Sequence, residues 1–273
     1  MIPIGVCLGT FGVSYANLHD AALTIERADL DSVWVWDHYR SWENPRQSVL
    51  EGPTALAGLA QATERIGLGT LVANNNNRHP ARLAKIAATL QEMAGGRFTL
   101  GIGGGGWAPE QEMLAIEQGD VAARTGKLAE ALTIIPQLWR GEPVSFAGTH
   151  YQLRDAVVAP APMPRPPIIV GARGPALCRL AGECADGLNL QWRGGEKLPE
   201  LLAALDDGLR ASGRSRAGFD LSVHAGLPDL GERGADQIAA WEGLGFTRAI
   251  IYLAPPYDLG GLGAAIGHQG LER

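Results

Sequence analysis

Short apolar runs alternate with longer amphipathic segments along most of the chain. The runs are rich in Val, Ile and Leu, and the segments between them have the three- and four-residue apolar spacing of helices. Eight runs are predicted as strands: 2–9, 32–39, 67–75, 97–103, 168–172, 186–192, 219–225 and 247–254. Helices are predicted between them at 17–30, 53–66, 80–95, 120–140, 175–184, 197–212 and 234–245, and a short one is predicted at the end of the chain.

Strands that alternate with helices indicate an α/β protein with a parallel sheet covered by helices. A closed TIM-type (β/α)8 barrel needs about 250 residues, and the chain has 273. We therefore predict one barrel domain over 1–273; an open, doubly wound sheet is the alternative. An insertion at 141–167, with a short hairpin at 144–153, separates strands 4 and 5. It is a candidate lid or rim over the active face.

Composition narrows the choice of partners. The net charge is −6 and the isoelectric point about 5.5, and no basic stripe typical of nucleic-acid-binding proteins is present. No uncharged apolar run reaches the roughly 20 residues that span a bilayer, and the first residues, MIPIGVCLG, lack the basic region of a signal peptide. Cys7, Cys178 and Cys184 form no C-x-x-C pair. We expect reduced thiols, a cytoplasmic location, and neither nucleic acid nor membrane as a partner.

The stretch FTLGIGGGGWAPE is the least ordinary part of the sequence, because five of the six residues from Gly101 to Gly106 are glycine. GIGGGG fits the G-x-G-x-x-G fingerprint, but in dinucleotide-binding folds that fingerprint opens the first βα turn and an acid ends the next strand. Here it follows the fourth predicted strand and precedes a helix. In a barrel these glycines leave the strand at the active face, where a flat ring can lie against bare backbone. A flexible surface loop is the alternative.

Polar residues follow the second and third predicted strands. VWVWDHY places Asp37 and His38 at a strand end, and His exchanges a proton most readily near neutral pH. A neighbouring carboxylate would hold its tautomer, and Trp42 offers an aromatic wall; a structural, hydrogen-bonded His is the alternative. The amides of 74–77 suit tight turns and can also bond the polar atoms of a ring.

The fifth predicted strand leads into GARGPALCRL. A glycine-flanked loop at a helix start presents free N–H groups, and Arg173 adds a positive charge, so the segment suits a phosphate group. A plain helix start is the alternative. The six His form no H-x-H or H-E-x-x-H pattern, and G-x-S-x-G is absent. The sequence therefore predicts neither a metal site nor a serine hydrolase.

Taken in order, these segments resemble the luciferase-like monooxygenase superfamily, and within it the oxidoreductases that depend on the deazaflavin coenzyme F420. The resemblance rests on VWVWDHY, RIGLGTLVANNNNRHPARLAKIAATLQEMAGGRFTLGIGGGGW, RTGKLAEALTIIPQLWRGEPVSFAGTHYQL, PPIIVGARGP and ADGLN. It implies a TIM-type barrel with the ring at its C-terminal mouth, catalytic roles for His38 and Asp37, and a bulge behind the ring, often with a non-proline cis peptide. The cofactor-binding residues that it implies are Trp42, Leu71, Val72, Ala73, Asn74, Gly103, Gly104, Gly105, Gly106, Gly171, Ala172, Arg173 and Gly174.

The sequence also departs from the sugar-phosphate dehydrogenases of the family. Gly106 stands where they place an acid, and their lysine after strand six is replaced around Arg193, so a sugar phosphate is in doubt as the substrate. We expect hydride transfer between F420 and a small organic substrate, with His38 handling the proton and Glu110 or water as its substitute. An FMN-dependent monooxygenase that activates O2, and a non-catalytic flavin-binding barrel, are the alternatives. A homodimer is possible.

Overall fold

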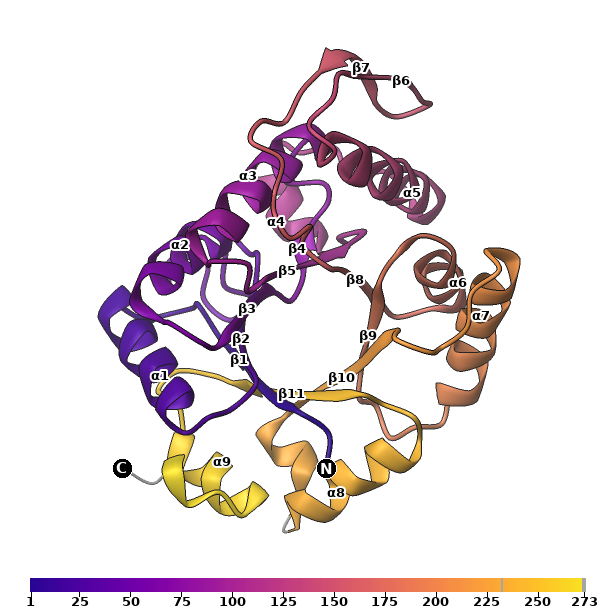
Figure 1. The fold of residues 1–273 in the computed structure, drawn as a ribbon. Helices are drawn as coiled ribbons and strands as arrows, with labels where there is room; N and C mark the ends of the chain where they lie inside the picture. Colours follow the sequence, from indigo (N-terminus) through magenta and orange to yellow (C-terminus); the bar gives the residue numbers. More distant parts are fainter. Residues whose placement is uncertain (232, 272–273) are drawn as a thin grey trace.

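The computed structural model describes residues 1–231 and 233–271, and its centre is a closed barrel of parallel strands (Figure 1). The barrel strands are β1 (Ile4–Leu8), β2 (Ser32–Val35), β3 (Gly67–Thr70), β5 (Phe98–Gly103), β8 (Ile168–Ala172), β9 (Gly187–Gln191), β10 (Asp220–Gly226) and β11 (Arg248–Leu253). They lie in the order β3–β2–β1–β11–β10–β9–β8–β5, and the pairing of β5 with β3 closes the ring. The TIM-type fold is thus confirmed.

Helices surround the barrel and cover its apolar outer surface. The outer ring consists of α1 (Tyr15–Arg27), α2 (Gly52–Ala62), α3 (Pro80–Met93), α5 (Val121–Leu138), α6 (Pro175–Cys184), α7 (Leu198–Ala211), α8 (Gly234–Gly243) and α9 (Leu259–Ile266). Shorter elements are α4 (Ala108–Met113), η1 (Leu227–Leu230) and η2 (Gln269–Leu271). Across the described part of the chain, no helix combines the length and apolar character needed to cross a membrane.

Trp34 fills the inside of the barrel. Its Nε1 donates to Ser32 Oγ at 2.8 Å, and its side chain is fully buried. A Cβ atom on Gly69 would lie 2.3 Å from the indole ring, and one on Gly5 would lie 2.9 Å from Nε1. Both neighbouring strands therefore need glycine beside Trp34, whose ring plugs the barrel below the carboxyl ends of the strands.

The third strand is interrupted where its polar end begins. β3 stops at Thr70, the peptide between Leu71 and Val72 is cis, and β4 (Ala73–Asn74) then resumes pairing with β5. The expected bulge with a non-proline cis peptide is confirmed. The second strand is also shorter than predicted, because pairing stops at Val35 and the next three residues line the cavity instead.

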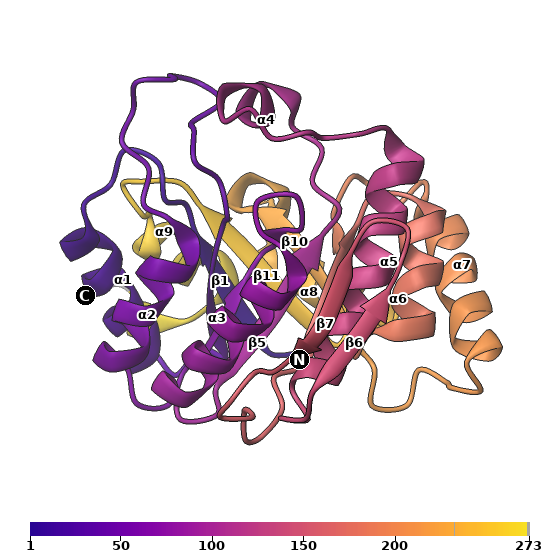
Figure 2. The ribbon, with the colours of Figure 1, turned by 90° about the horizontal axis from the view of Figure 1, so that it is seen from above.

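The segment 141–167 is neither a lid nor a rim of the cavity, and that prediction is wrong. It forms a hairpin of β6 (Val144–Ala147) and β7 (Gln152–Ala156) on the outside, beside α5 (Figures 1 and 2). The segment follows a helix, so the chain has already returned to the amino ends of the strands when it enters it. The carboxylate of Glu130 on α5 accepts the backbone N–H groups of residues 149–151. The Asn75 side chain donates to the Tyr151 hydroxyl at 3.2 Å, so the hairpin supports the 74–77 loop from outside.

Candidate functional site

A cavity of about 1060 Å³ opens at the carboxyl ends of the barrel strands. Asp37 lies just beyond β2, Gly103 ends β5 and Gly171 lies near the end of β8, and all three line the cavity as predicted. The other expected site residues that line it are His38, Trp42, Leu71, Val72, Asn74, Gly104, Gly105, Gly106, Ala172, Arg173 and Gly174. Ala73 does not line the cavity and is fully buried. The rim comes from 104–125 rather than from 141–167.

Part of the glycine run serves the packing of the chain itself. A Cβ on Gly101 would lie 1.9 Å from Thr70 O, and Cβ atoms on Gly103 and Gly171 would lie 2.7 and 2.8 Å from the methyl groups of Val72. The bulged strand therefore presses against two neighbouring strands that must be bare at these points. The side chain of Val72 therefore lies in the cavity wall with glycine backbone on either side.

The rest of the run is open to the cavity. Gly105 has φ +68, which L side chains rarely adopt, and its Cβ would meet Asn74 Oδ1 at 2.3 Å. A Cβ on Gly106 would meet nothing within 4 Å, and one on Gly104 would meet Arg124 only at ordinary contact distance. No packing contact requires glycine at 104, and Gly106 has φ +158, a conformation that L side chains rarely adopt; both line the cavity without a side chain.

His38 is held by a buried carboxylate. Its Nδ1 lies 3.1 Å from Glu110 Oε2, and the same oxygen accepts the backbone N–H of Tyr39 at 2.8 Å. The Glu110 side chain is 1% exposed and that of His38 is 28% exposed. If Nδ1 donates to the carboxylate, Nε2 is left as the atom that exchanges a proton. The second oxygen, Glu110 Oε1, is buried and finds no partner among the described residues.

Asp37 is engaged elsewhere and does not pair with His38. Its carboxylate forms a bidentate ion pair with Arg78 at 2.6 and 2.9 Å and accepts the backbone N–H of Asn74 at 2.8 Å. Arg78 also bonds Glu51. The Asp37 carboxylate is fully buried, and this pairing raises the pKa of Arg78 despite its burial. Asp37 thereby ties the end of β2 to the loop after β4.

Aromatic rings surround His38. The ring of Trp42 lies 5.5 Å from it and that of Trp107 lies 5.9 Å away, both nearly perpendicular to the imidazole. Trp36 stacks on Tyr252 at 4.3 Å and an interplanar angle of 18°. Trp107 was not predicted as a site residue; it directly follows the glycine run and is the N-cap of α4, a helix too short to produce a periodic signal.

Arg173 stands at the start of α6. The helix begins at Pro175, its N-cap is Gly174, and no side chain caps it, so first-turn N–H groups face the cavity mouth. Arg173 lines the same wall. A positive charge beside uncapped amides fits an anionic group such as phosphate.

A hydrogen-bonded His was also missed by the sequence analysis. His224 on β10 has its Nδ1 2.5 Å from Asn189 Oδ1, and Asn189 Nδ2 donates to Ser222 Oγ at 2.9 Å. Burial, helped by Arg173 and Arg193, lowers the pKa of His224 to about 4. The imidazole is therefore neutral, and its Nε2 is a hydrogen-bond acceptor in a part of the wall near Arg173.

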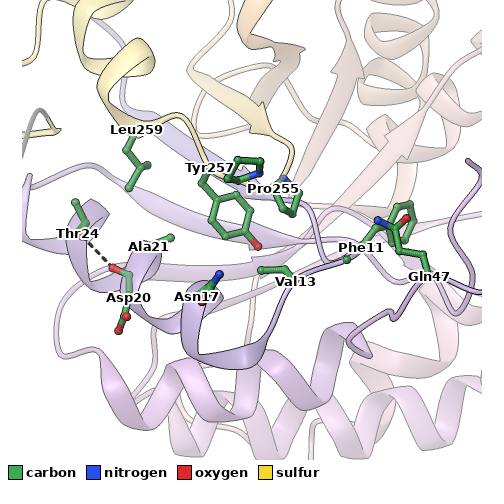
Figure 3. Close-up of a pocket in the computed structure, with 12 residues that line it drawn as sticks. Phe11, Val13, Asn17, Asp20, Ala21, Thr24, Gln47, Pro255, Tyr257 and Leu259 are labelled. Atoms are coloured by element: carbon green, nitrogen blue, oxygen red, sulfur yellow. Dashed lines mark hydrogen bonds between the residues drawn. The ribbon is translucent and has the colours of Figure 1, made fainter. Parts of the chain in front are cut away.

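A second pocket, of about 500 Å³, lies outside the barrel between α1 and the segment before α9 (Figure 3). Asn17 and Asp20 contribute polar atoms, and the Tyr257 hydroxyl already donates to Gly9 O at 2.7 Å. Phe11 lines this pocket and also contacts Trp42 of the main cavity at 4.6 Å between ring centroids. Its ring is thus the wall between the two. In the described chain, no three His, Cys, Asp or Glu side chains converge to hold a metal ion.

Comparison with known proteins identifies the family of this barrel. The model of the luciferase-like monooxygenase family matches residues 3–250. The chain belongs to this family. It is 38% identical over 207 residues to an F420-dependent glucose-6-phosphate dehydrogenase of Microbacterium testaceum, covering 75% of this chain and 61% of that protein. It is 37% identical over 214 residues to an enzyme of the same name from Kineococcus radiotolerans, covering 77% and 63%.

Solved structures agree with the family at the level of the fold. An F420-dependent secondary alcohol dehydrogenase, in complex with an F420–acetone adduct, has a TM-score of 0.89 at 18% identity and covers 100% of this chain and 99% of its own. A coenzyme F420-dependent tetrahydromethanopterin reductase from Methanopyrus kandleri has a TM-score of 0.79 at 18% identity, with 98% of both chains covered. Against the curated dehydrogenases, this luciferase-like chain spans only about three fifths of their length.

Proposed function

We propose that this luciferase-like chain is an oxidoreductase that transfers a hydride between coenzyme F420 and a small organic substrate. The relatives and the solved structures described above support it, because they are named as F420-dependent enzymes. The observation that carries the proposal is the contact between His38 Nδ1 and Glu110 in the wall of a large cavity at the active end of a barrel. A barrel that only binds a flavin has no need of such a pair.

The cavity fits a flat ring with a phosphate-bearing arm. The side chain of Val72 and the bare backbone of Gly104 and Gly106 offer a wall for the ring, while Arg173 and the uncapped amides of α6 fit the phosphate. When bound, the coenzyme supplies the ring carbon, C5, that accepts or gives the hydride. The protein supplies orientation and a proton.

His38 is the residue proposed to move that proton. Glu110 fixes the ring orientation, and the Tyr39 N–H group fixes Glu110 in turn. This leaves Nε2 to take a proton from a substrate hydroxyl, or to give one to a carbonyl oxygen. Glu110 is fully buried, so we assign it a positioning role through His38 rather than direct contact with substrate. The proposed role of Asp37 is likewise structural, because three donors already occupy its carboxylate.

Equilibrium titration of the purified apoprotein with F420 and with FMN, side by side, tests the cofactor. We expect F420 to bind more tightly, with fluorescence of the coenzyme as the readout. Tight binding of FMN together with no binding of F420 would instead support an FMN-dependent monooxygenase.

Three sequence-based expectations remain part of the proposal. Cys7, Cys178 and Cys184 are free thiols in the structure, which suits a reducing cytoplasm. The acidic net charge of −6 argues against nucleic acid as a partner. A homodimer is proposed, and size-exclusion chromatography with light scattering tests it.

A further inference from the structure

The order of the strands divides the cavity mouth into two halves of different chemistry. β2, β1 and β11 are neighbours. Trp36 and Trp42 follow β2, and Tyr252 lies at the end of β11. Together with His38 and Trp107, these residues form what we call the aromatic half of the mouth. β5, β8 and β9 are also neighbours, on the opposite side of the ring (Figure 1). The glycine run and Arg173 follow β5 and β8, and Arg124 lies at the start of α5; they form the basic half.

The aromatic half is a continuous apolar surface that is only partly covered. Trp36 lies between Tyr252 at 4.3 Å and Trp42 at 4.8 Å, measured between ring centroids. Trp107 reaches across from the end of β5 to within 6.3 Å of Trp42. Although it belongs to this cluster, Trp42 is 47% exposed. An apolar ligand beside His38 would cover this indole and gain the free energy of burying it.

Among the described residues that line the aromatic half, none carries a fixed charge that is exposed to an ionic substrate. The carboxylates of Asp37 and Glu110 are buried and bonded, at 0% and 1% exposure. The nearby guanidinium of Arg40 lies 5.6 Å from the Trp107 ring centroid, donates to Pro109 O, and is not part of the cavity lining. Both arginines that line the cavity belong to the basic half, where we place the phosphate of the cofactor.

A sugar phosphate fits this surface poorly. Its phosphate would meet no lining cation beside His38, and each hydroxyl buried against indole without a partner costs about 1–3 kcal/mol. The hydroxyl or carbonyl oxygen at the reacting carbon is different, because His38 Nε2 can bond it. The aromatic half therefore matches a substrate with one polar oxygen and an apolar remainder.

We propose that the substrate is an uncharged alcohol, or the corresponding carbonyl compound, that carries an aryl or cycloalkyl group. This inference rests on the proposed function for its chemistry, and on the aromatic half alone for its binding. In the alcohol direction the C–H bond of the carbinol carbon breaks and its electron pair leaves as hydride to C5 of the bound coenzyme. The hydroxyl proton goes to His38 Nε2 as the C=O bond forms; His38 then releases a proton to solvent, and solvent supplies one proton to the reduced ring. The alcohol loses two hydrogens and the coenzyme gains two.

Binding of 1-phenylethanol, cyclohexanol and glucose 6-phosphate to the cofactor-free protein tests the surface directly. Tryptophan fluorescence is the readout, since Trp36, Trp42 and Trp107 line the cavity. We expect both alcohols to change the fluorescence in a saturable way and glucose 6-phosphate to leave it unchanged. Trp107→Ala should weaken 1-phenylethanol about 10-fold, a loss typical of one aromatic contact. The matched control is Trp192→Ala, because Trp192 packs on Trp241 and does not line the cavity.

The same protein is then loaded with F420, and kcat/KM is compared for the three compounds. Turnover of 1-phenylethanol at least 100-fold more efficient than that of glucose 6-phosphate is the expected result. Saturable binding of glucose 6-phosphate that equals or exceeds binding of the alcohols would overturn the inference, as would an equal loss of affinity in both tryptophan variants. If the alcohols bind the apoprotein but F420 does not, the proposed function fails and the inference about the surface stands.

Discussion

Removal of the imidazole by His38→Ala gives the sharpest test of the mechanism. His38 stands in the cavity wall with Nδ1 3.1 Å from the buried Glu110 carboxylate, so the substitution removes the group that we propose exchanges a proton with substrate. A positioned general acid or base contributes about 10²- to 10⁴-fold in rate, which corresponds to about 3–5 kcal/mol of barrier at roughly 1.4 kcal/mol per decade. We therefore expect turnover to fall by two decades or more.

Cofactor affinity should change far less, because the proposed ring contacts come from Val72 and glycine backbone and the proposed phosphate contacts from Arg173. The assay measures F420 titration, thermal unfolding and kcat on one preparation, with His19→Ala as the control, since His19 lies on the surface at α1. A folded, cofactor-saturated His38→Ala variant with unchanged turnover would refute the assignment. The proton would then have to come from water, because Glu110 is fully buried.

Three other substitutions test separate parts of the site. Arg173→Ala should weaken F420 binding, and by a larger factor at low salt, where a partly exposed ion pair is least screened; titrations at two ionic strengths check this. Asp37→Ala leaves the buried Arg78 without its bidentate partner and should lower the free energy of unfolding in urea by about 3 kcal/mol; no change would mean that the pair is not structural. The pKa of His224 is lowered by burial from 6.5 to about 4, so the unfolded state binds its proton first as pH falls. Stability should decline from pH 6.5 towards pH 4 by at most about 3 kcal/mol, and His224→Gln should flatten this part of the urea-unfolding profile.

The local sequence was sufficient to predict those strands and helices whose ends are marked by their own residues. The strand 168–172 and the helix 175–184 were predicted with the bounds that the structure has, because a β-branched run and a proline at the first helical turn mark them. The helix α4 was missed, since its six residues cannot show a period. The hairpin was recognised, but its assignment as a lid ignored that a segment between a helix and the next strand starts at the amino ends of the strands.

The pairings within the site depended on tertiary structure. His38 and Glu110 are 72 positions apart, and nothing in the spacing distinguished Glu110 from Asp37 as the partner of His38. The sequence instead suggested the adjacent carboxylate, which the structure gives to Arg78. The glycine run was placed correctly at the mouth, whereas the reason for Gly103 and Gly171 is the side chain of Val72, which only the folded barrel brings next to them.

The division of the mouth has a consequence for how such a protein can change. Trp36, Trp42 and Tyr252 lie in stretches of sequence apart from Arg173 and the start of α6, and the two sets occupy different arcs of the ring. Mutations in one arc need not disturb the other, so a library confined to these three aromatic positions should yield new substrate preferences in clones that keep the parent's coenzyme. Gene duplicates can diverge in the same way, because each copy keeps the inherited redox chemistry while selection changes the substrates that it accepts.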